Sequence, residues 1–314
     1  MSWLANNDII IFSYKYNEEL DIELISDYKK LIFSNFALNK KLFKSYANNY
    51  FDNVKYEGSN FNQDVSDLPP NLTLINFGHN FNQDVSNLPP NLTYLTLGYK
   101  FNQDVSNLPQ SLIYLKLGIF FNQNVSTLPS NLKHLTFGYC FNHDISNLPK
   151  SLTHLTFGNY FNRDVSNLPK SLTHLTFGEK FNQDLSKLSP SITHLSLNNN
   201  FKQKYIIPTN VKYLTLNCNN QCIIDSLPNS IIELRLGCDF NLPIDNLPTS
   251  IKKLVFDEYN GDLNCLPNFV EELQLSRYYK KRISKIPLNL KKLICEENYP
   301  YKNDFAMCII QTYT

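Results

Sequence analysis

Polar and apolar positions recur along this chain with a constant period of twenty residues. A Phe-Asn pair opens each of seven successive units, and the phenylalanines are Phe61, Phe81, Phe101, Phe121, Phe141, Phe161 and Phe181. Within one unit, the four residues from His134 to Phe137 alternate polar and apolar, which predicts a half-buried β-strand. Gly138 then permits a sharp exit from that strand. A constant period this short predicts one strand-and-turn unit stacked on copies of itself.

The repeat continues beyond its last Phe-Asn pair. A Leu-Pro pair and a Leu-x-apolar element keep the same count as far as Leu275, with one-residue deletions before Ile207 and before Leu266. Each unit supplies six apolar residues, which fill one layer of a narrow coil and leave no room for a long helix. We therefore predict a mainly β solenoid of about twelve coils of about 20 residues over residues 58–300, with a parallel sheet on one face.

The two flanking segments carry no such repeat. Apolar residues in segments 21–33 and 37–47 are spaced closer to 3.6 than to 2, which predicts short helices. We expect residues 1–57 to form a small helical cap, because the first coil of a solenoid needs shielding from water. Residues 301–314 are expected to form a capping tail whose apolar side chains cover the last coil.

One unit also resembles a known repeat. Residues 141–149 read Phe-Asn-x-x-Ile-x-x-Leu-Pro, and residues 152–158 read Leu-Thr-His-Leu-Thr-Phe-Gly. This pattern resembles the FNIP repeat, a relative of leucine-rich repeats known mainly from social amoebae and from giant viruses of amoebae. The chain departs from the family where it has Asp144, Asp164 or Asn124 in place of the usual proline. The resemblance implies a leucine-rich-repeat-like solenoid that binds proteins and has no enzymatic activity.

The first segment also resembles an F-box, with which FNIP chains of giant viruses often begin. Residues 7–12 resemble its opening helix and residues 40–46 its closing helix. The usual Leu-Pro start is absent, and residues 18–21 are mostly acidic where an apolar interface helix would be expected. As an F-box, residues 1–57 would bind a Skp1-like adaptor, and the solenoid would be the substrate receptor of a ubiquitin ligase.

Composition narrows the function further. A net charge of +1 with 18% charged residues favours neither nucleic acid nor an anionic membrane as partner. Seven cysteines, an odd number without a disulfide framework, are typical of a reducing compartment, so we expect a cytoplasmic protein, in the host cytoplasm if it is viral. The sequence has no phosphate-binding loop, metal-ligand spacing or nucleophile motif, so we predict no enzyme, cofactor or metal.

The strand face carries the candidate partner-binding residues. One outward position repeats an aromatic or imidazole ring, and its members are Tyr94, Tyr114, His134, His154, His174, His194 and Tyr213. Such a row could stabilise the sheet by stacking alone, bind a protein partner, or hold zinc between adjacent imidazoles. The sequence therefore predicts an interaction scaffold, with the ubiquitin-ligase receptor and a passive structural rod as alternatives.

Two polar rows run along the turns. The first comprises Asp64, Asp84, Asp104, Asn124, Asp144, Asp164 and Asp184, which could cap backbone amides, meet a basic partner or bind calcium. The second is a row of structural turn asparagines, comprising Asn62, Asn82, Asn102, Asn122, Asn142, Asn162 and Asn182. We expect these asparagines to satisfy backbone groups of neighbouring coils.

Overall fold

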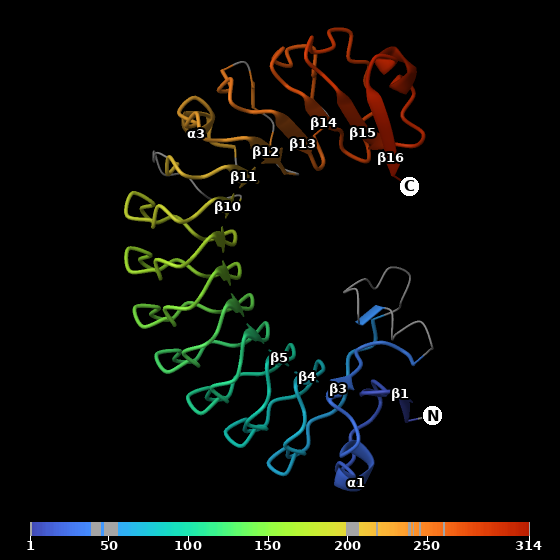
Figure 1. Cartoon of the computed structure of the whole chain (residues 1–314), viewed down its shortest axis with the longest axis vertical. Helices are drawn as coiled ribbons and strands as arrows, with labels where there is room; N and C mark the ends of the chain where they lie inside the picture. Colours follow the sequence, from blue (N-terminus) through green and yellow to red (C-terminus); the bar gives the residue numbers. More distant parts are fainter. Residues whose placement is uncertain are drawn as a thin grey trace. The chain divides into compact units, whose positions relative to one another are not determined.

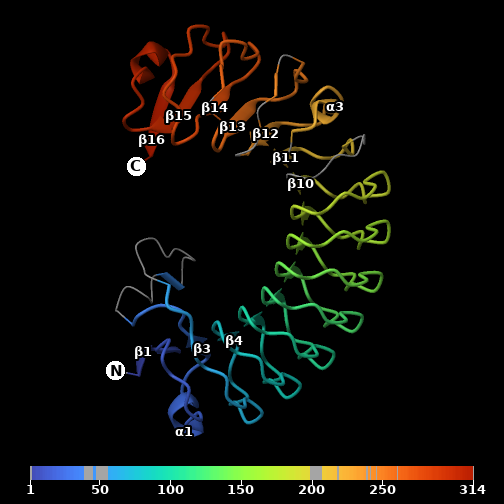
Figure 2. The same ribbon diagram turned by 180° about the vertical axis from the view of Figure 1, so that it is seen from behind.

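The computed structural model describes residues 2–38, 45–46, 56–198, 207–217, 219–237, 240, 242–244, 246–259 and 261–313. It forms two compact units, Met1–Arg163 and Asp164–Thr314. Each unit is a run of narrow coils, and each coil contributes one short strand to a sheet along one side (Figures 1 and 2).

The sheet of the first unit has its strands in chain order. The strands are β1 (Trp3–Asn6), β2 (Ile9–Phe12), β3 (Lys30–Phe33), β4 (Leu74–Asn76), β5 (Tyr94–Thr96), β6 (Tyr114–Lys116), β7 (His134–Thr136) and β8 (His154–Thr156). β1 pairs antiparallel with β2, and every later pair in this unit is parallel. The register is constant, so that equivalent residues of successive coils stand side by side.

The sheet of the second unit is parallel throughout. Its strands are β9 (His174–Thr176), β10 (His194–Leu197), β11 (Tyr213–Leu216), β12 (Glu233–Leu236), β13 (Lys253–Phe256), β14 (Glu272–Gln274), β15 (Lys292–Glu296) and β16 (Ile309–Tyr313). The short helices among the described residues include α1 (Ile22–Ile25) in the first unit and α3 (Gln221–Ile224) and η1 (Lys302–Phe305) in the second. The predicted mainly β solenoid is confirmed, and β4 to β15 match its twelve coils one for one.

The core consists of the repeated apolar residues, which stack on their equivalents in the next coil. In the first unit the rings of Phe101, Phe121 and Phe141 are 6.1–6.2 Å apart and almost parallel. All three side chains are fully buried. Because one coil is a single layer thick, each ring packs against its equivalents in the neighbouring coils, as expected for repeat proteins.

The predicted helical cap is wrong for most of its described part. Of residues 21–33 only Ile22–Ile25 are helical, while Lys30–Phe33 form β3. Ile9–Phe12, which resemble the opening helix of an F-box, form β2. These strands have consecutive apolar residues because both of their faces are buried: Ile32 points away from the core yet is only 4% exposed. A run of this kind lacks the alternation that identifies a half-buried strand.

Most of residues 37–47, for which a second helix is predicted, lies outside the described residues. At the other end, the tail adds β16 to the sheet beside β15. Phe305 is buried, as a capping residue should be, but Met307 and Ile309 are 97% and 70% exposed. Only part of the predicted apolar cover is therefore formed.

Candidate binding surface on the strand face

The ring-bearing residues predicted from the sequence stand in a row on the outer face of each sheet. In the first unit they are Tyr94, Tyr114, His134 and His154, here called the first strip. The rings of Tyr94 and Tyr114 stack at 4.1 Å, and those of His134 and His154 at 4.3 Å. Tyr114 and His134 are 6.1 Å apart and tilted by 30°. The first strip is thus a nearly continuous surface of rings.

The second unit carries the remaining predicted residues, His174, His194 and Tyr213, here called the second strip. His194 stacks on His174 at 3.8 Å and on Tyr213 at 4.2 Å. A shallow groove of about 380 Å³ follows these residues, with the hydroxyl groups of Thr176 and Ser196 beside them. The structure therefore groups the seven residues into one strip in each unit.

Threonine hydroxyls orient three of the imidazoles. The Nδ1 atoms of His154, His174 and His194 lie 2.9 Å from the hydroxyl of the preceding threonine. The hydroxyl of Thr153 donates its proton to the carbonyl oxygen of Lys133 at 3.2 Å. Thr153 therefore links the His154 ring to the preceding coil, which fixes the orientation of that ring.

Burial changes the pKa of Tyr114 in the first strip. Desolvation, followed by the adjacent Tyr94, raises the pKa of the Tyr114 phenol well above its usual value. Tyr114 is therefore uncharged at any physiological pH and keeps its hydroxyl proton. A ring that ends in such a group supplies both apolar contact and a hydrogen bond.

From β12 onward, charged residues replace the rings on the outer face of the sheet. Glu233 pairs with Lys253 at 3.1 Å, and Glu271 bridges Lys252 and Lys291 at 3.2 and 2.6 Å. These side chains alternate in charge from strand to strand and so neutralise one another. Exposed pairs of this kind contribute about 0–1 kcal/mol each, but they leave little net field for a partner.

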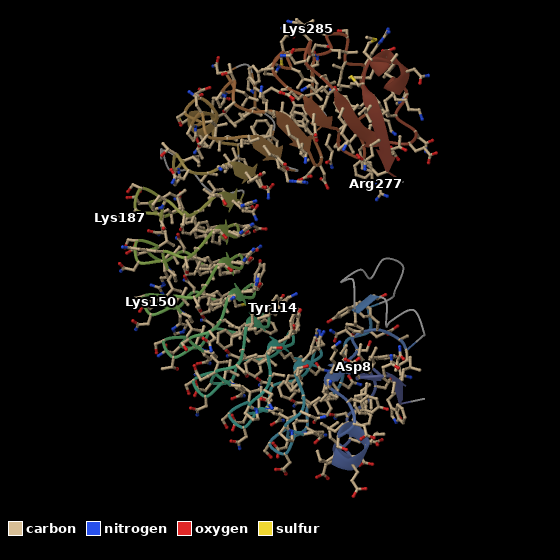
Figure 3. The ribbon with its side chains drawn as sticks, in the orientation of Figure 1. Asp8, Tyr114, Lys150, Lys187, Arg277 and Lys285 are labelled. Carbon is tan, nitrogen blue, oxygen red and sulfur yellow. The ribbon has the colours of Figure 1, made fainter. Side chains whose placement is uncertain are left out.

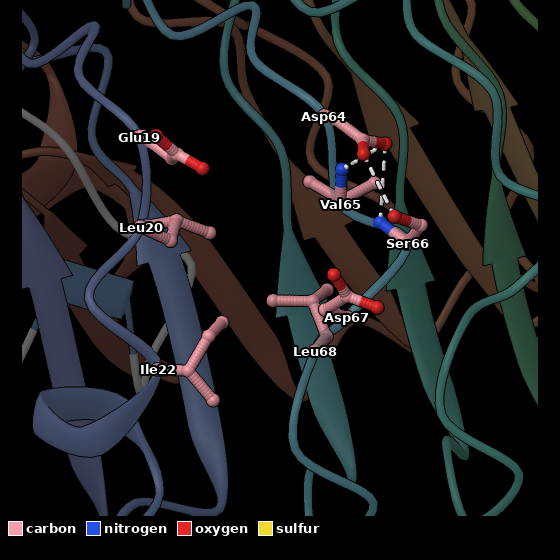
Figure 4. A pocket seen from close by; sticks show the side chains of 8 residues that line it. All are labelled: Glu19, Leu20, Ile22, Asp64, Val65, Ser66, Asp67 and Leu68. Carbon is pink, nitrogen blue, oxygen red and sulfur yellow. Dashed lines mark hydrogen bonds between the residues drawn. The ribbon is translucent and has the colours of Figure 1, made fainter.

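The aspartate row caps the turns. In the first repeat, Asp64 Oδ1 accepts from the amides of Val65 (2.8 Å) and Ser66 (3.2 Å), and Oδ2 accepts from the Ser66 hydroxyl at 2.7 Å (Figure 4). The same Asp-Ser pattern recurs at Asp144, and Asn124 accepts from the Ser126 amide at 2.8 Å. The hollow beside Asp64 measures only about 70 Å³, far below the range of ligand pockets.

These caps make the stability of the solenoid depend on pH. The Ser146 hydroxyl, and then its amide, lower the pKa of Asp144, and the equivalent serines lower the pKa of Asp84, Asp164 and Asp184. A lowered pKa in the folded state means that the stabilisation is complete above the unfolded pKa of about 4. It is lost as the pH falls through the folded value. We expect the free energy of unfolding to decrease below about pH 4.

Urea unfolding at pH 7 and pH 3 measures this dependence. Ser146→Ala removes the main cause of the lowered pKa and should reduce the difference between the two pH values. Ser126→Ala is the matched control, because its partner Asn124 does not titrate. If Ser146→Ala and Ser126→Ala show the same pH difference as the unchanged chain, the caps are not the titrating groups.

The asparagine row forms a ladder between coils. The amide of Asn142 donates to Asn122 Oδ1 at 2.9 Å, and the amide of Asn162 donates to Asn142 Oδ1 at 3.0 Å. The ladder begins earlier than the Phe-Asn count, since the amide of Asn62 donates to Asn17 Oδ1 at 2.9 Å. Tyr16-Asn17 is thus a diverged Phe-Asn pair that the sequence pattern missed, because residues 34–57 lengthen the next coil.

Replacing Asn122 by alanine removes the acceptor of the Asn142 amide. Because the Asn122 side chain is exposed, water can partly replace it, and we expect a loss of about 1 kcal/mol in unfolding free energy. Urea titration measures this loss. A loss below a few tenths of a kcal/mol would show that water satisfies the amide equally well.

A second exposed row escaped the sequence analysis. The turns that follow β5 to β8 in the first unit bear large apolar side chains, namely Tyr99, Ile119, Phe120, Tyr139 and Tyr160, which are 36–48% exposed. Some of these rings touch, as Tyr99 and Phe120 do at 5.0 Å and Tyr139 and Tyr160 at 5.1 Å. In the sequence, this row is indicated only by large apolar residues at the two variable positions between the repeated glycine and the next Phe-Asn pair.

In the part of the chain that the structure describes, no three His, Cys, Asp or Glu side chains are grouped to hold a metal ion. No helix among the same residues is long and apolar enough to cross a membrane.

Stacked coils, one parallel strand per coil and an inter-coil asparagine ladder define a leucine-rich-repeat-like solenoid. CroV588 of the giant virus CroV, a circular LRR protein, matches with a TM-score of 0.67 and 29% identity. The match covers 95% of this chain and 51% of CroV588, so the chain spans about half the length of that protein. The internalin inlF of Listeria monocytogenes matches with a TM-score of 0.56 and 17% identity over 91% of this chain and 86% of its own, a likeness of fold alone.

The repeat itself is also identified. The FNIP repeat model matches residues 84–120, 121–160, 144–180, 161–189 and 203–239. The chain therefore contains FNIP repeats between residues 84 and 239. Among curated proteins, none is significantly similar to it in sequence.

Proposed function

We propose that this chain is a non-enzymatic scaffold that binds a protein partner on its strand face. The first strip carries the proposal, because it presents stacked rings, fixed imidazoles and hydroxyl groups on a rigid sheet. Rings already fixed by stacking lose little conformational entropy when a partner binds, and such rings dominate many interfaces. The leucine-rich-repeat-like fold supports this, since solenoids offer extended surfaces for binding.

One narrower role, binding of an adaptor, has less support. The adaptor-binding role needs an F-box, yet residues 9–12 form a strand, so nothing in the described residues favours a Skp1-like adaptor. A cytoplasmic location remains part of the proposal, and it is supported by the odd number of cysteines, seven, without a disulfide framework in the sequence.

Site-specific crosslinking tests the proposed surface. A photoreactive benzoylphenylalanine at Tyr114 should crosslink a defined protein in the cells that make this chain. The same probe at Lys150, which lies on the turn side of the first unit away from the strands, is the control (Figure 3). The purified partner should then bind Tyr114→Ala and His134→Ala at least tenfold more weakly than the unchanged chain. Equal affinity for all of these variants would refute the strand face as the binding surface.

A further inference from the structure

A cavity of about 370 Å³ lies at the start of the first strip. Its wall is formed by Ile9, Lys30, Ile32, Leu74, Asn76, Tyr94 and Tyr46. Ile9, Lys30, Leu74 and Tyr94 occupy one register position on β2 to β5. The cavity is therefore continuous with the first strip, and Tyr94 belongs to both.

The cavity exists because part of the strand face is covered. Phe36, Leu38 and Tyr46 pack over Ile11 and Ile32, which would otherwise be exposed on the outer face. Burial raises the pKa of Tyr46 to about 12, so the side of the cavity formed by Tyr46 is uncharged. Leu74, one strand further on, is still partly exposed, and the cavity forms there, beside the cover. Its volume falls in the range of about 300–1,000 Å³ typical of pockets that bind small ligands.

The strands next to this cavity carry lysine side chains but no acidic side chains that could pair with them. None of the described residues of β3 to β8 is Asp or Glu. Lys116 on β6 and Lys133 just before β7 are exposed beside Tyr114 and His134. Lys30 differs, since Asp8 pairs with it at 3.2 Å. The first strip therefore has a positive flank, unlike the self-neutralised strands β12 to β15.

We propose that the cavity and the first strip together bind an acidic peptide segment of the partner. One aromatic or branched aliphatic side chain fills the cavity between Leu74 and Tyr94. The peptide then runs across the strands over Tyr114, and its carboxylates face Lys116 and Lys133. This assignment rests on the proposed scaffold function and adds the chemistry of the partner to it.

Strand geometry sets the spacing within that peptide. Neighbouring strands are about 4.8 Å apart, which places Lys116 roughly 7 Å and Lys133 roughly 12 Å from the cavity. An extended peptide advances about 3.3 Å per residue. The acidic residues should therefore lie about two to four positions from the apolar residue. Such charges also accelerate association at low salt.

Selection from a random display library of 12-residue peptides against the full chain tests this assignment. Selected peptides should share one large apolar residue with Asp or Glu two to four positions away. N-acetyltryptophanamide at millimolar concentration should compete with them, a measurement that needs no variant. Selection of peptides without this pattern, or no competition, would overturn the assignment.

Matched variants separate the cavity from the strip. Leu74→Tyr fills the cavity with the residue that the next two strands carry at the same position, and it should weaken the peptide at least tenfold. Lys116→Ala with Lys133→Ala should weaken it mainly at low salt, while Leu288→Ala, at an 83% exposed site of the second unit, should change nothing. Loss with Tyr114→Ala but not with Leu74→Tyr would overturn the cavity assignment alone. No loss with either would overturn the scaffold surface as well.

Discussion

Replacing Gly118 by alanine is expected to destabilise the first unit by about 3 kcal/mol or more, at the upper end for overpacking. A Cβ on Gly118 would lie 1.8 Å from the carbonyl oxygen of Gly98. That oxygen belongs to the main chain and cannot rotate away. Gly98 is itself confined, because its own Cβ would lie 1.7 Å from the carbonyl oxygen of Gly78. A shift of one coil would therefore disturb the next.

Gly237→Ala is the matched control for this effect. The Cβ of residue 237 would lie 1.6 Å from Oδ1 of Asn217, which is the end of a side chain and can turn aside. Urea unfolding followed by circular dichroism compares the two variants. We expect the Gly118 variant to lose clearly more unfolding free energy. Equal losses would mean that the coils separate easily and that backbone contact is not the constraint.

The reason for these glycines could not be predicted from the sequence. The pattern suggested that Gly138 permits a sharp exit from the strand. Among the described residues, however, Gly58 is the one glycine with a positive φ, so Gly138 is not selected for an unusual conformation. Its Cβ would instead lie 1.9 Å from the carbonyl oxygen of Gly118. Space between coils is a property of the stack and cannot be deduced from one unit alone.

For the surface too, features set by the repeat could be predicted from the sequence, and features set by other segments could not. The first strip follows from a constant period, because any residue repeated every twenty positions must form a row. The cavity beside Leu74 depends instead on Phe36 and Tyr46, which fold over the sheet from a segment outside the repeat. Apolar residues buried on both faces also concealed β2 and β3. Local periodicity thus predicts the repeated frame, whereas contacts made by non-repeated segments require the structure.

Replacing Phe121 by alanine is expected to cost about 3–5 kcal/mol of unfolding free energy. The ring is fully buried and stacks between Phe101 at 6.2 Å and Phe141 at 6.1 Å. Its loss removes contacts with both neighbouring coils. The gap cannot close readily, because the sheet register and the Asn122 ladder fix the spacing of the coils. In a solenoid, weakening two adjacent interfaces affects the cooperativity of the whole unit.

The preceding residue provides an internal control. Phe120 is 47% exposed, and its ring contact given for the described residues is an edge-to-face contact with Tyr99 at 5.0 Å. Phe120→Ala should therefore cost no more than about 0.5 kcal/mol, the range of surface substitutions. Urea unfolding of both variants decides the point. Similar losses for Phe120→Ala and Phe121→Ala would contradict the assignment of Phe121 to the core and of Phe120 to the surface.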